Sequence, residues 1–429
     1  MHPIKEIISK YKSGEHIGIF SNCSANEYVL RSVMRRCKAK GIPALIEATA
    51  NQVDQDGGYT GMTPKDFYNW CYELAVNEGL DPSMLILGGD HLGPLTWTKL
   101  SEADAMEKAD RLVSEYVLAG FTKIHIDTSM RLASDDPNER LSDEIIAARG
   151  ARLCAVAEKA FEKRQNDVPD AVSPVYIIGS EVPIPGGAQE HEELGVTSKE
   201  NCLATISAFK KAFDEKGLDA AWERVVAVVV QPGVEFSEDE VFVYNSDKAK
   251  ELCTVLKNDR FVFEGHSTDY QPRPALRELV NDGIIILKVG PALTFALREA
   301  LFALENIEKI SLSGSNLELS RFSDVLEAVM LEKPEQWNRH YHGDEYKQKI
   351  NRAYGFSDRV RYYLPEPAVQ KSIARLVSNL SKPVPLPLLS QYMPIQYARV
   401  RDGIINNDVN ELILDRIGDC IDDYIYALL

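Results

Sequence analysis

Residues 84–94 read MLILGGDHLGP, and our interpretation of the chain starts from this stretch. Its first four residues are apolar and predict a short strand that is buried on both faces. Two glycines follow, and after them come an acid, Asp90, and an imidazole, His91. A strand that ends in such a pair, with glycine on both sides, is typical of a functional site. The alternative is an ordinary turn in which Asp90 caps the next helix.

An apolar strand followed by a helix recurs through about the first 310 residues. We expect strands at 16–22, 44–49, 84–87, 123–129, 175–182, 224–233, 260–267 and 284–290. Eight such units predict an α/β protein with a parallel (β/α)8 barrel, or TIM barrel, over residues 1–310. A doubly wound open sheet is the alternative, but the chain contains neither G-x-G-x-x-G nor G-x-x-x-x-G-K-[ST]. Residues 311–429 are expected to form a helical C-terminal extension that packs on the barrel.

The overall composition excludes some classes of partner. The formal net charge of −17 argues against nucleic acid and anionic membrane surfaces, which attract basic patches. The N-terminus has no apolar signal region and no apolar run is long enough to span a bilayer, so we expect a cytoplasmic protein. The seven cysteines are scattered without a C-x-x-C pair, which indicates reduced thiols.

The carboxyl ends of the strands meet on one face of such a barrel, where catalytic groups gather. Alternation along the fourth strand places His125 and Asp127 on the same face. Imidazoles and carboxylates at one face suit a divalent metal together with acid/base chemistry. The residues at these ends are Cys23, Asn26, Glu47, Asn51, Gln52, Asp90, His91, His125, Asp127, Glu181, Gln231, Glu235, His266, Asp269 and Lys288.

Lys288 has two other interpretations. It is a candidate partner for Glu47 inside the barrel. A lysine on a barrel strand can also form a Schiff base with a ketose, which needs no metal.

Eight segments carry a resemblance to one family. They are IEATANQVDQDGGYTGMTP (46–64), LGGDHLGP (87–94), KIHIDTSM (123–130), GSEVPIPGG (179–187), VVVQPGVEF (228–236), FEGHSTDYQ (263–271), LKVGPALTFALREA (287–300) and SDRVRYYLP (357–365). With these segments the chain resembles the GatZ/KbaZ family, the partner subunits of class II tagatose-1,6-bisphosphate aldolases. The resemblance implies either a non-catalytic subunit that stabilises a catalytic aldolase subunit, or a metal-dependent ketose 4-epimerase. Some members are labelled tagatose-6-phosphate kinases, but the chain has no P-loop.

The barrel also resembles the catalytic class II aldolases more distantly. That resemblance implies that Asp90 is the acid/base on the carbon-4 hydroxyl and that His91 and His266 are metal ligands. Where a third histidine is expected, on the sixth strand, the chain has Gln231, and Glu181 is a candidate to supply the missing ligand.

We therefore expect a metal-dependent epimerase that interconverts tagatose and fructose forms by opening the carbon 3–carbon 4 bond, or by proton transfer at carbon 4. The expected catalytic residues are Asp90, Glu47 and Asp127, and the expected ligands of a Zn, Mn, Ni or Co ion are His91, Glu181, His266 and Gln231. A ketohexose or its phosphate is expected to contact Asn51, His125, Ser267, Asp269, Lys288 and Arg359, and Thr268 and Arg361 are further candidates to meet the phosphate. We also expect an oligomer, and the alternative function requires a class II aldolase catalytic subunit as partner.

Overall fold

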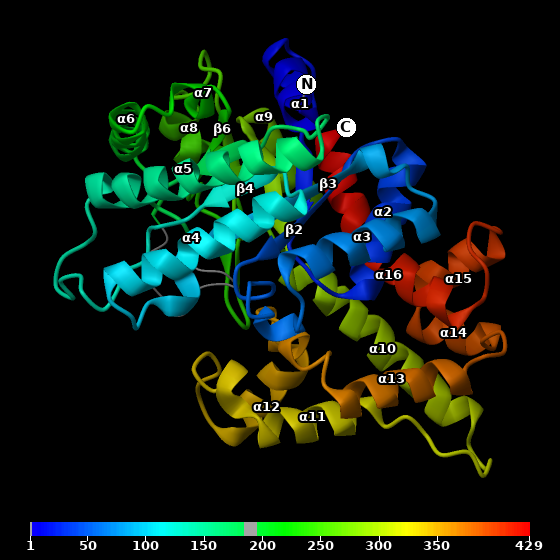
Figure 1. The fold of residues 1–429 in the computed structure, drawn as a ribbon. Helices are drawn as coiled ribbons and strands as arrows, with labels where there is room; N and C mark the ends of the chain where they lie inside the picture. Colours follow the sequence, from blue (N-terminus) through cyan, green and yellow to red (C-terminus); the bar gives the residue numbers. More distant parts are fainter. Residues whose placement is uncertain (1, 184–194) are drawn as a thin grey trace.

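The computed structural model describes residues 2–183 and 195–429, and its centre is a closed barrel of eight parallel strands (Figure 1). The strands follow one another around the barrel in the order β1-β10-β9-β6-β5-β4-β3-β2. The predicted (β/α)8 barrel is therefore confirmed. The strand bounds are β1 Ile19–Asn22, β2 Ala44–Thr49, β3 Leu85–Leu92, β4 Lys123–Ile126, β5 Val175–Ile178, β6 Val225–Val230, β9 Val262–Gly265 and β10 Ile284–Val289.

Six of the eight strands are shorter than expected, and two further details differ. β3 continues through Asp90 and His91 instead of ending before the glycines, because Gly88–Asp90 pair with β2 and Leu92 pairs with β4. A short antiparallel hairpin, β7 (Glu235–Phe236) with β8 (Val241–Phe242), lies in the connection after β6.

Helices surround the barrel, and most begin at a side chain that caps the first turn. Asn26, Thr63, Ser101, Ser142 and Ser198 each accept backbone N–H groups at the start of α2, α3, α4, α5 and α6, which satisfies donors that a helix leaves free. The helices of this part are α1 Pro3–Lys12, α2 Glu27–Lys40, α3 Pro64–Glu78, α4 Glu102–Ala119, α5 Asp143–Asp167, α6 Lys199–Glu215, α7 Asp219–Trp222, α8 Ser246–Cys253, α9 Arg273–Asn281 and α10 Pro291–Ser311. Short 3₁₀ turns are η1 Gly58–Thr60, η2 Pro82–Met84 and η3 Leu95–Trp97.

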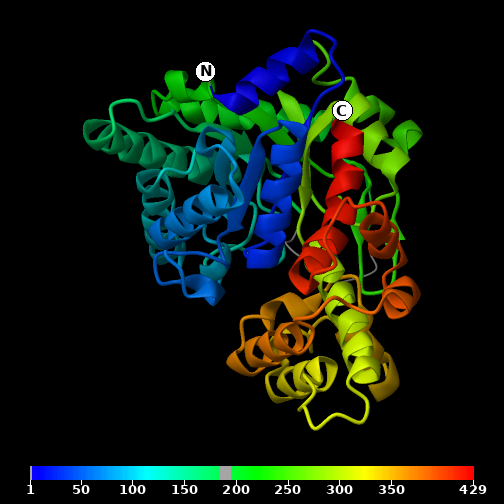
Figure 2. The same ribbon diagram turned by 90° about the vertical axis from the view of Figure 1, so that its right-hand side faces the viewer.

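The C-terminal extension is helical, as expected, and packs on the barrel. Figure 2 shows it below the barrel, around the far end of α10. Its last helix returns to the barrel wall, where it packs between α2, α9 and α10. The elements are α11 Phe322–Glu332, η4 Pro334–Gln336, α12 Glu345–Tyr354, η5 Arg359–Tyr362, α13 Pro367–Asn379, α14 Leu386–Tyr392, α15 Pro394–Arg401 and α16 Val409–Leu428. In the described part of the chain, no helix has the length and apolar character needed to cross a bilayer.

The interior of the barrel contains ionised side chains. Lys123 on β4 lies between Glu47 on β2, at 2.6 Å, and Glu264 on β9, at 2.7 Å, and all three side chains are fully buried. The Ser21 hydroxyl donates a hydrogen bond to Glu47. Gly88 on β3 makes room for this arrangement, because a Cβ there would lie 2.8 Å from Cγ of Glu47. A buried charge is tolerated only where it is paired, so Lys123 is a structural requirement of the barrel.

We predict that Lys123→Met lowers the free energy of unfolding by about 3–5 kcal/mol, because it leaves two buried carboxylates without their shared cation. The same substitution at the exposed Lys159 on α5 is the control and should change stability by less than about 0.5 kcal/mol. Urea denaturation of both variants measures the difference. Equal stability of the two variants would contradict the structural role of Lys123.

Candidate functional site

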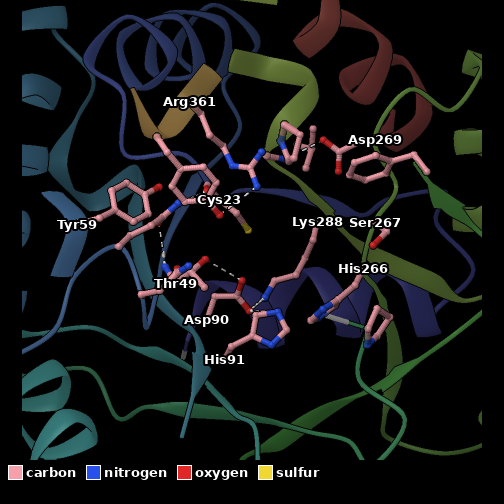
Figure 3. A pocket seen from close by; sticks show the side chains of 18 residues that line it. Cys23, Thr49, Tyr59, Asp90, His91, His266, Ser267, Asp269, Lys288 and Arg361 are labelled. Atoms are coloured by element: carbon pink, nitrogen blue, oxygen red, sulfur yellow. Dashed lines mark hydrogen bonds and ion pairs between the residues drawn. The ribbon is translucent and has the colours of Figure 1, made fainter. Parts of the chain in front are cut away.

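A cavity opens at the carboxyl ends of the barrel strands, where the sequence predicts the site. Its volume is about 70 Å³, and it is open to solvent. In Figure 3, Asp90, His91 and His266 lie on one side of it, and Tyr59 and Arg361 lie on the other. The side chains around it are those of Cys23, Thr49, Asn51, Gln52, Tyr59, Asp90, His91, Pro183, Phe236, His266, Ser267, Asp269, Lys288, Val289, Pro291, Arg361 and Tyr362, and Gly290 contributes backbone.

Three histidines form a triangle at one side of this cavity, where His91 and His266 line it and His125 lies behind them. The ring centroids of His91 and His125 are 5.0 Å apart, those of His125 and His266 are 5.0 Å apart, and those of His91 and His266 are 5.1 Å apart. The backbone is unusual at this point, since His91 has φ 49° and Ser267, next to His266, has φ 53°. Residues other than glycine rarely adopt this conformation, and it is common at functional sites.

A carboxylate lies beside one ring nitrogen of each of these histidines. Nδ1 of His91 lies 2.6 Å from the Asp127 carboxylate, and Nε2 of His266 lies 3.0 Å from the Glu264 carboxylate. Each ring is thus fixed through one nitrogen while the other is left for a ligand, an arrangement typical of metal-binding histidines. Burial, followed by the nearby Lys288 ammonium, lowers the pKa of His266 to about 3, so its ring is neutral at pH 7, as a metal ligand must be.

His125 differs from the other two. Its Nδ1 lies 2.9 Å from Oδ1 of Asp90 and 3.1 Å from the backbone N–H of His91. Its Nε2 is buried and has no hydrogen-bond partner among the described residues. Burial lowers the pKa of this imidazole. A buried nitrogen without a partner is costly in a folded protein, so it indicates a position where a ligand belongs.

Asp90 contacts both His125 and the Lys288 ammonium group. Its Oδ1 contacts the Lys288 ammonium, and its Oδ2 accepts a hydrogen bond of 3.2 Å from Thr49. Burial raises the pKa of Asp90, but the opposing effects of His91, Lys288 and His125 are larger and hold this pKa well below its ordinary value. Asp90 is therefore an ionised carboxylate that lines the cavity.

The residues present fit a divalent cation. One donor atom from each of Asp90, His125 and His266 lies within 4.8 Å of the others, so these three could hold a metal ion. The buried charges around them leave an excess of two negative charges when the carboxylates are counted as ionised and the histidines as neutral. The charged groups counted are the four carboxylates Glu47, Asp90, Asp127 and Glu264 and the two ammonium groups Lys123 and Lys288. A divalent ion would neutralise this excess.

Of the four predicted metal ligands, only His266 belongs to this cluster; His91 lies beside it, and Glu181 and Gln231 lie away from it. The Glu181 carboxylate accepts hydrogen bonds from Arg140, at 3.2 Å, and from Asn201, at 2.7 Å. The side-chain oxygen of Gln231 accepts from the backbone N–H groups of Gly233 and Val234. Glu181 and Gln231 lie after the ends of β5 and β6, and their side chains bind to partners outside the histidine cluster. The third imidazole of the cluster is instead His125, which the sequence analysis assigned to the substrate.

The other predicted residues divide into two groups. Asn51, Ser267, Asp269 and Lys288 line the cavity as expected. Glu47, Asp127, His125 and Arg359 do not line it but lie behind residues that do: Glu47 pairs with Lys123 and Lys288, Asp127 holds His91, and Arg359 contacts Tyr362. The pairing of Glu47 with Lys288 corresponds to the structural interpretation that the sequence left open.

The sequence analysis missed Lys123 and Glu264 as parts of the site. Both carried a signal, because each stands two residues before a histidine of the cluster and so shares its face of the strand. It also missed Tyr59 and Tyr362, whose rings contact each other with centroids 5.0 Å apart. Tyr59 lies in a loop and Tyr362 in the C-terminal extension, where no strand pattern predicts the direction of a side chain.

Glu235, beside the cavity-lining residues Ser267 and Asp269, gives a prediction about pH. Burial raises the pKa of its carboxyl from 4.5 to about 7. The folded chain therefore keeps a proton that the unfolded chain has released, and stability is lost as the pH rises from 4.5 to 7. Glu235→Gln removes this penalty and should stabilise the protein by up to about 3 kcal/mol at pH 8 and by much less at pH 5.

Urea denaturation at both pH values measures this difference. Glu240→Gln, at an exposed position near β8, is the matched control and should have no pH-dependent effect. A gain in stability that is the same for Glu235→Gln at pH 5 and pH 8 would contradict the assignment.

The fold and the cavity define a (β/α)8 barrel protein with a candidate metal centre at the carboxyl ends of its strands. The profile of the family described as "D-tagatose-1,6-bisphosphate aldolase subunit GatZ/KbaZ-like" matches residues 4–428. The chain therefore belongs to the GatZ/KbaZ-like family, which confirms the resemblance seen in the sequence.

Comparison with solved structures gives matches at high and at low identity. A probable tagatose 6 phosphate kinase from Sinorhizobium meliloti 1021 is 43% identical, with a TM-score of 0.86 over 96% of this chain and 100% of that chain. The YdjI aldolase from Escherichia coli K12 is 12% identical, with a TM-score of 0.41 over 88% of this chain and 97% of that chain. Fructose-bisphosphate aldolase from Campylobacter jejuni is 13% identical, with a TM-score of 0.43 over 87% and 91%. Nothing about function follows from the last two, because the similarity is too low.

Proposed function

We propose that this protein is a divalent-metal-dependent ketose 4-epimerase that interconverts tagatose and fructose forms, as free ketohexoses or as their phosphates. The observation that carries the proposal is the cluster of Asp90, His125 and His266 at one side of an open cavity. The membership in a family named for tagatose metabolism supports the choice of sugar.

The proposed metal ligands are Asp90, His125 and His266, which revises the set expected from the sequence. When bound there, a divalent ion polarises the carbonyl of a ketose as a Lewis acid. The neutral state of His266 and the free Nε2 of His125 support their place in this set.

His91, with Asp127 behind it, is the proposed proton carrier. Asp127 accepts the hydrogen bond from Nδ1 of His91, which fixes the tautomer and leaves Nε2 free to accept a proton from a substrate hydroxyl. Asp90 was the expected carrier. Its pKa is held well below the ordinary value, which makes it a weak base, and it lies beside His125 and His266, so we assign it to the metal instead.

The proposed reaction begins when His91 takes the proton of the carbon-4 hydroxyl. The carbon 3–carbon 4 bond then breaks, its electron pair passes into the polarised ketone to form an enediolate, and carbon 4 becomes an aldehyde. Rotation of the aldehyde presents its other face, the bond forms again, and His91 returns the proton to the oxygen. The net change is the inversion of carbon 4. Direct deprotonation and reprotonation at carbon 4 is the alternative route.

Lys288 is better suited to charge stabilisation than to a Schiff base. Its ammonium contacts Asp90 and lies 3.4 Å from both Glu47 and Glu264. Burial lowers the pKa of Lys288, but these three carboxylates raise it further and leave it well above its ordinary value. A Schiff base requires a neutral amine, whereas a protonated Lys288 can stabilise negative charge in the cavity.

The second candidate function is a non-catalytic subunit that stabilises a class II aldolase catalytic subunit. The family description, which names an aldolase subunit, favours it. Such a subunit needs a docking surface but no buried acid/base cluster. An epimerase requires such a cluster, and we therefore favour the epimerase.

The test uses the purified protein alone, with its bound metal quantified. Tagatose and fructose, free and phosphorylated, are incubated with the protein, and we expect interconversion that a chelator abolishes and that the added metal restores. Asp90→Asn should lower the rate by about a hundredfold or more, because it removes a charged ligand. Asp110→Asn, at a surface ion pair with Arg152, is the matched control and should keep the activity.

No bound metal and no turnover would contradict the epimerase. If the same preparation then raised the activity or stability of a class II aldolase catalytic subunit, the second candidate would replace it.

A further inference from the structure

Two arginines of the C-terminal extension lack the partner that the other buried arginines have. Arg359 is only 4% exposed, and no carboxylate lies within 4 Å of it in the described part of the chain; the same is true of Arg361, which is partly buried. The other buried arginines each pair with an acid: Arg149 with Asp135 at 2.6 Å, Arg298 with Asp358 at 3.2 Å and Arg352 with Glu327 at 2.6 Å. In a chain of net charge −17, two neighbouring buried cations without an acid are exceptional.

The hydrogen bonds of the two arginines go to hydroxyls, backbone oxygens and His340, and to no carboxylate in the described part of the chain. Arg361 donates to the backbone oxygen of Asp358, at 2.9 Å, and to the Tyr362 hydroxyl, at 3.2 Å. Arg359 donates to the same hydroxyl at 3.4 Å, and its buried Nε has no partner. The nearby positive charge is also evident at His340, whose pKa is lowered to about 4 by burial and then by these two arginines.

The position of Arg361 connects this positive charge with the cavity. Arg361 lines the cavity that contains Asp90 and His266, and Figure 3 shows its guanidinium reaching in from the side opposite these residues. It also lines a smaller adjoining pocket with the hydroxyls of Ser24 and Thr60. A ligand held near the histidines can therefore extend toward Arg361.

The place where barrels of this kind usually bind a phosphate is occupied in this chain. That place is formed by the loops after the seventh and eighth strands and the following helix N-terminus. Here the Asp269 carboxylate accepts the N–H groups of Gly290, at 3.0 Å, and Ala292, at 2.8 Å, at the start of α10. An acid in this position excludes a second anion from the same N–H groups.

We propose that Arg361, supported by Arg359 and Tyr362, forms the subsite for a phosphate monoester group of the ligand. The C-terminal extension, and not the barrel loops, then supplies the recognition of phosphate. For the identity of the rest of the ligand, a ketose, this inference rests on the proposed function. Guanidinium groups suit the subsite, because their planar donors bind phosphate oxygens in pairs.

Calorimetric titration of the purified full-length protein tests the subsite. The probes are inorganic phosphate, fructose, fructose 6-phosphate and ATP. We expect fructose 6-phosphate to bind more tightly than fructose, and Arg361→Gln to weaken its binding roughly 10- to 100-fold while fructose binding stays the same. Arg361→Lys should recover part of the loss, because it keeps the charge but not the paired donors.

The matched control is Arg401→Gln. Arg401 also donates to a tyrosine hydroxyl, that of Tyr397 at 3.0 Å, but it does not line the cavity, so its replacement should leave every affinity unchanged. Thermal unfolding of each variant confirms that the fold is kept, and unchanged fructose binding confirms it locally.

Three results would overturn the proposal: equal affinity of the wild type for fructose and fructose 6-phosphate, full affinity of Arg361→Gln for fructose 6-phosphate, or a loss that affects ATP but not the sugar phosphate. Arg361-dependent binding of fructose 6-phosphate or inorganic phosphate without any sugar interconversion would support the subsite and contradict the epimerase. The two proposals can therefore fail separately.

Discussion

The structure depends on the pairing of charges inside the barrel. Lys123 holds Glu47 and Glu264 together at the centre, and Lys288 lies between the same two acids and Asp90, one level nearer the cavity. Each of these groups would be costly to bury alone, so each fixes the position of the next. The histidine triangle is held by the same set of groups, since Asp90 and Glu264 bind two of its three rings. The ionic interior therefore supports the fold and also positions the candidate site.

This arrangement explains which parts of the site could be predicted from the sequence. Residues on strands were placed correctly as neighbours, because alternation and the common carboxyl end determine where their side chains point. Asp90 and His91 on β3, His125 on β4 and His266 just after β9 are examples. The apolar strands and capped helices likewise made the barrel predictable.

The loops and the extension could not be predicted in the same way. Glu181 and Gln231 lie away from the cluster because they form hydrogen bonds with residues outside the barrel strands. Alternation along a strand does not predict where side chains point beyond the end of the strand. Arg359 and Arg361 were both expected to be candidates for phosphate, but only the side chain of Arg361 lines the cavity. These two residues lie in a 3₁₀ turn that follows Asp358, whose φ is 42°, and a periodic pattern says nothing about directions in such a turn.

The C-terminal extension also has a structural connection to the cavity. Asp358 pairs with Arg298 and accepts a hydrogen bond from Thr294, and both partners lie on α10, the helix that follows the last barrel strand. Tyr270, from the loop after β9, donates to the backbone oxygen of Phe356. These contacts fix the turn that contains Arg361 over the mouth of the barrel, which explains how a segment far along the sequence contributes to the same cavity as the histidines.

The central claim is that the buried excess of negative charge is a metal site. The most direct measurement is anomalous diffraction from crystals of the protein grown with Mn²⁺ or Zn²⁺. The account predicts one peak between Asp90, His125 and His266, with an atom of each at roughly 2.0–2.2 Å for Zn²⁺. No peak at that position, with Lys288 as the only cation beside Asp90, would contradict it.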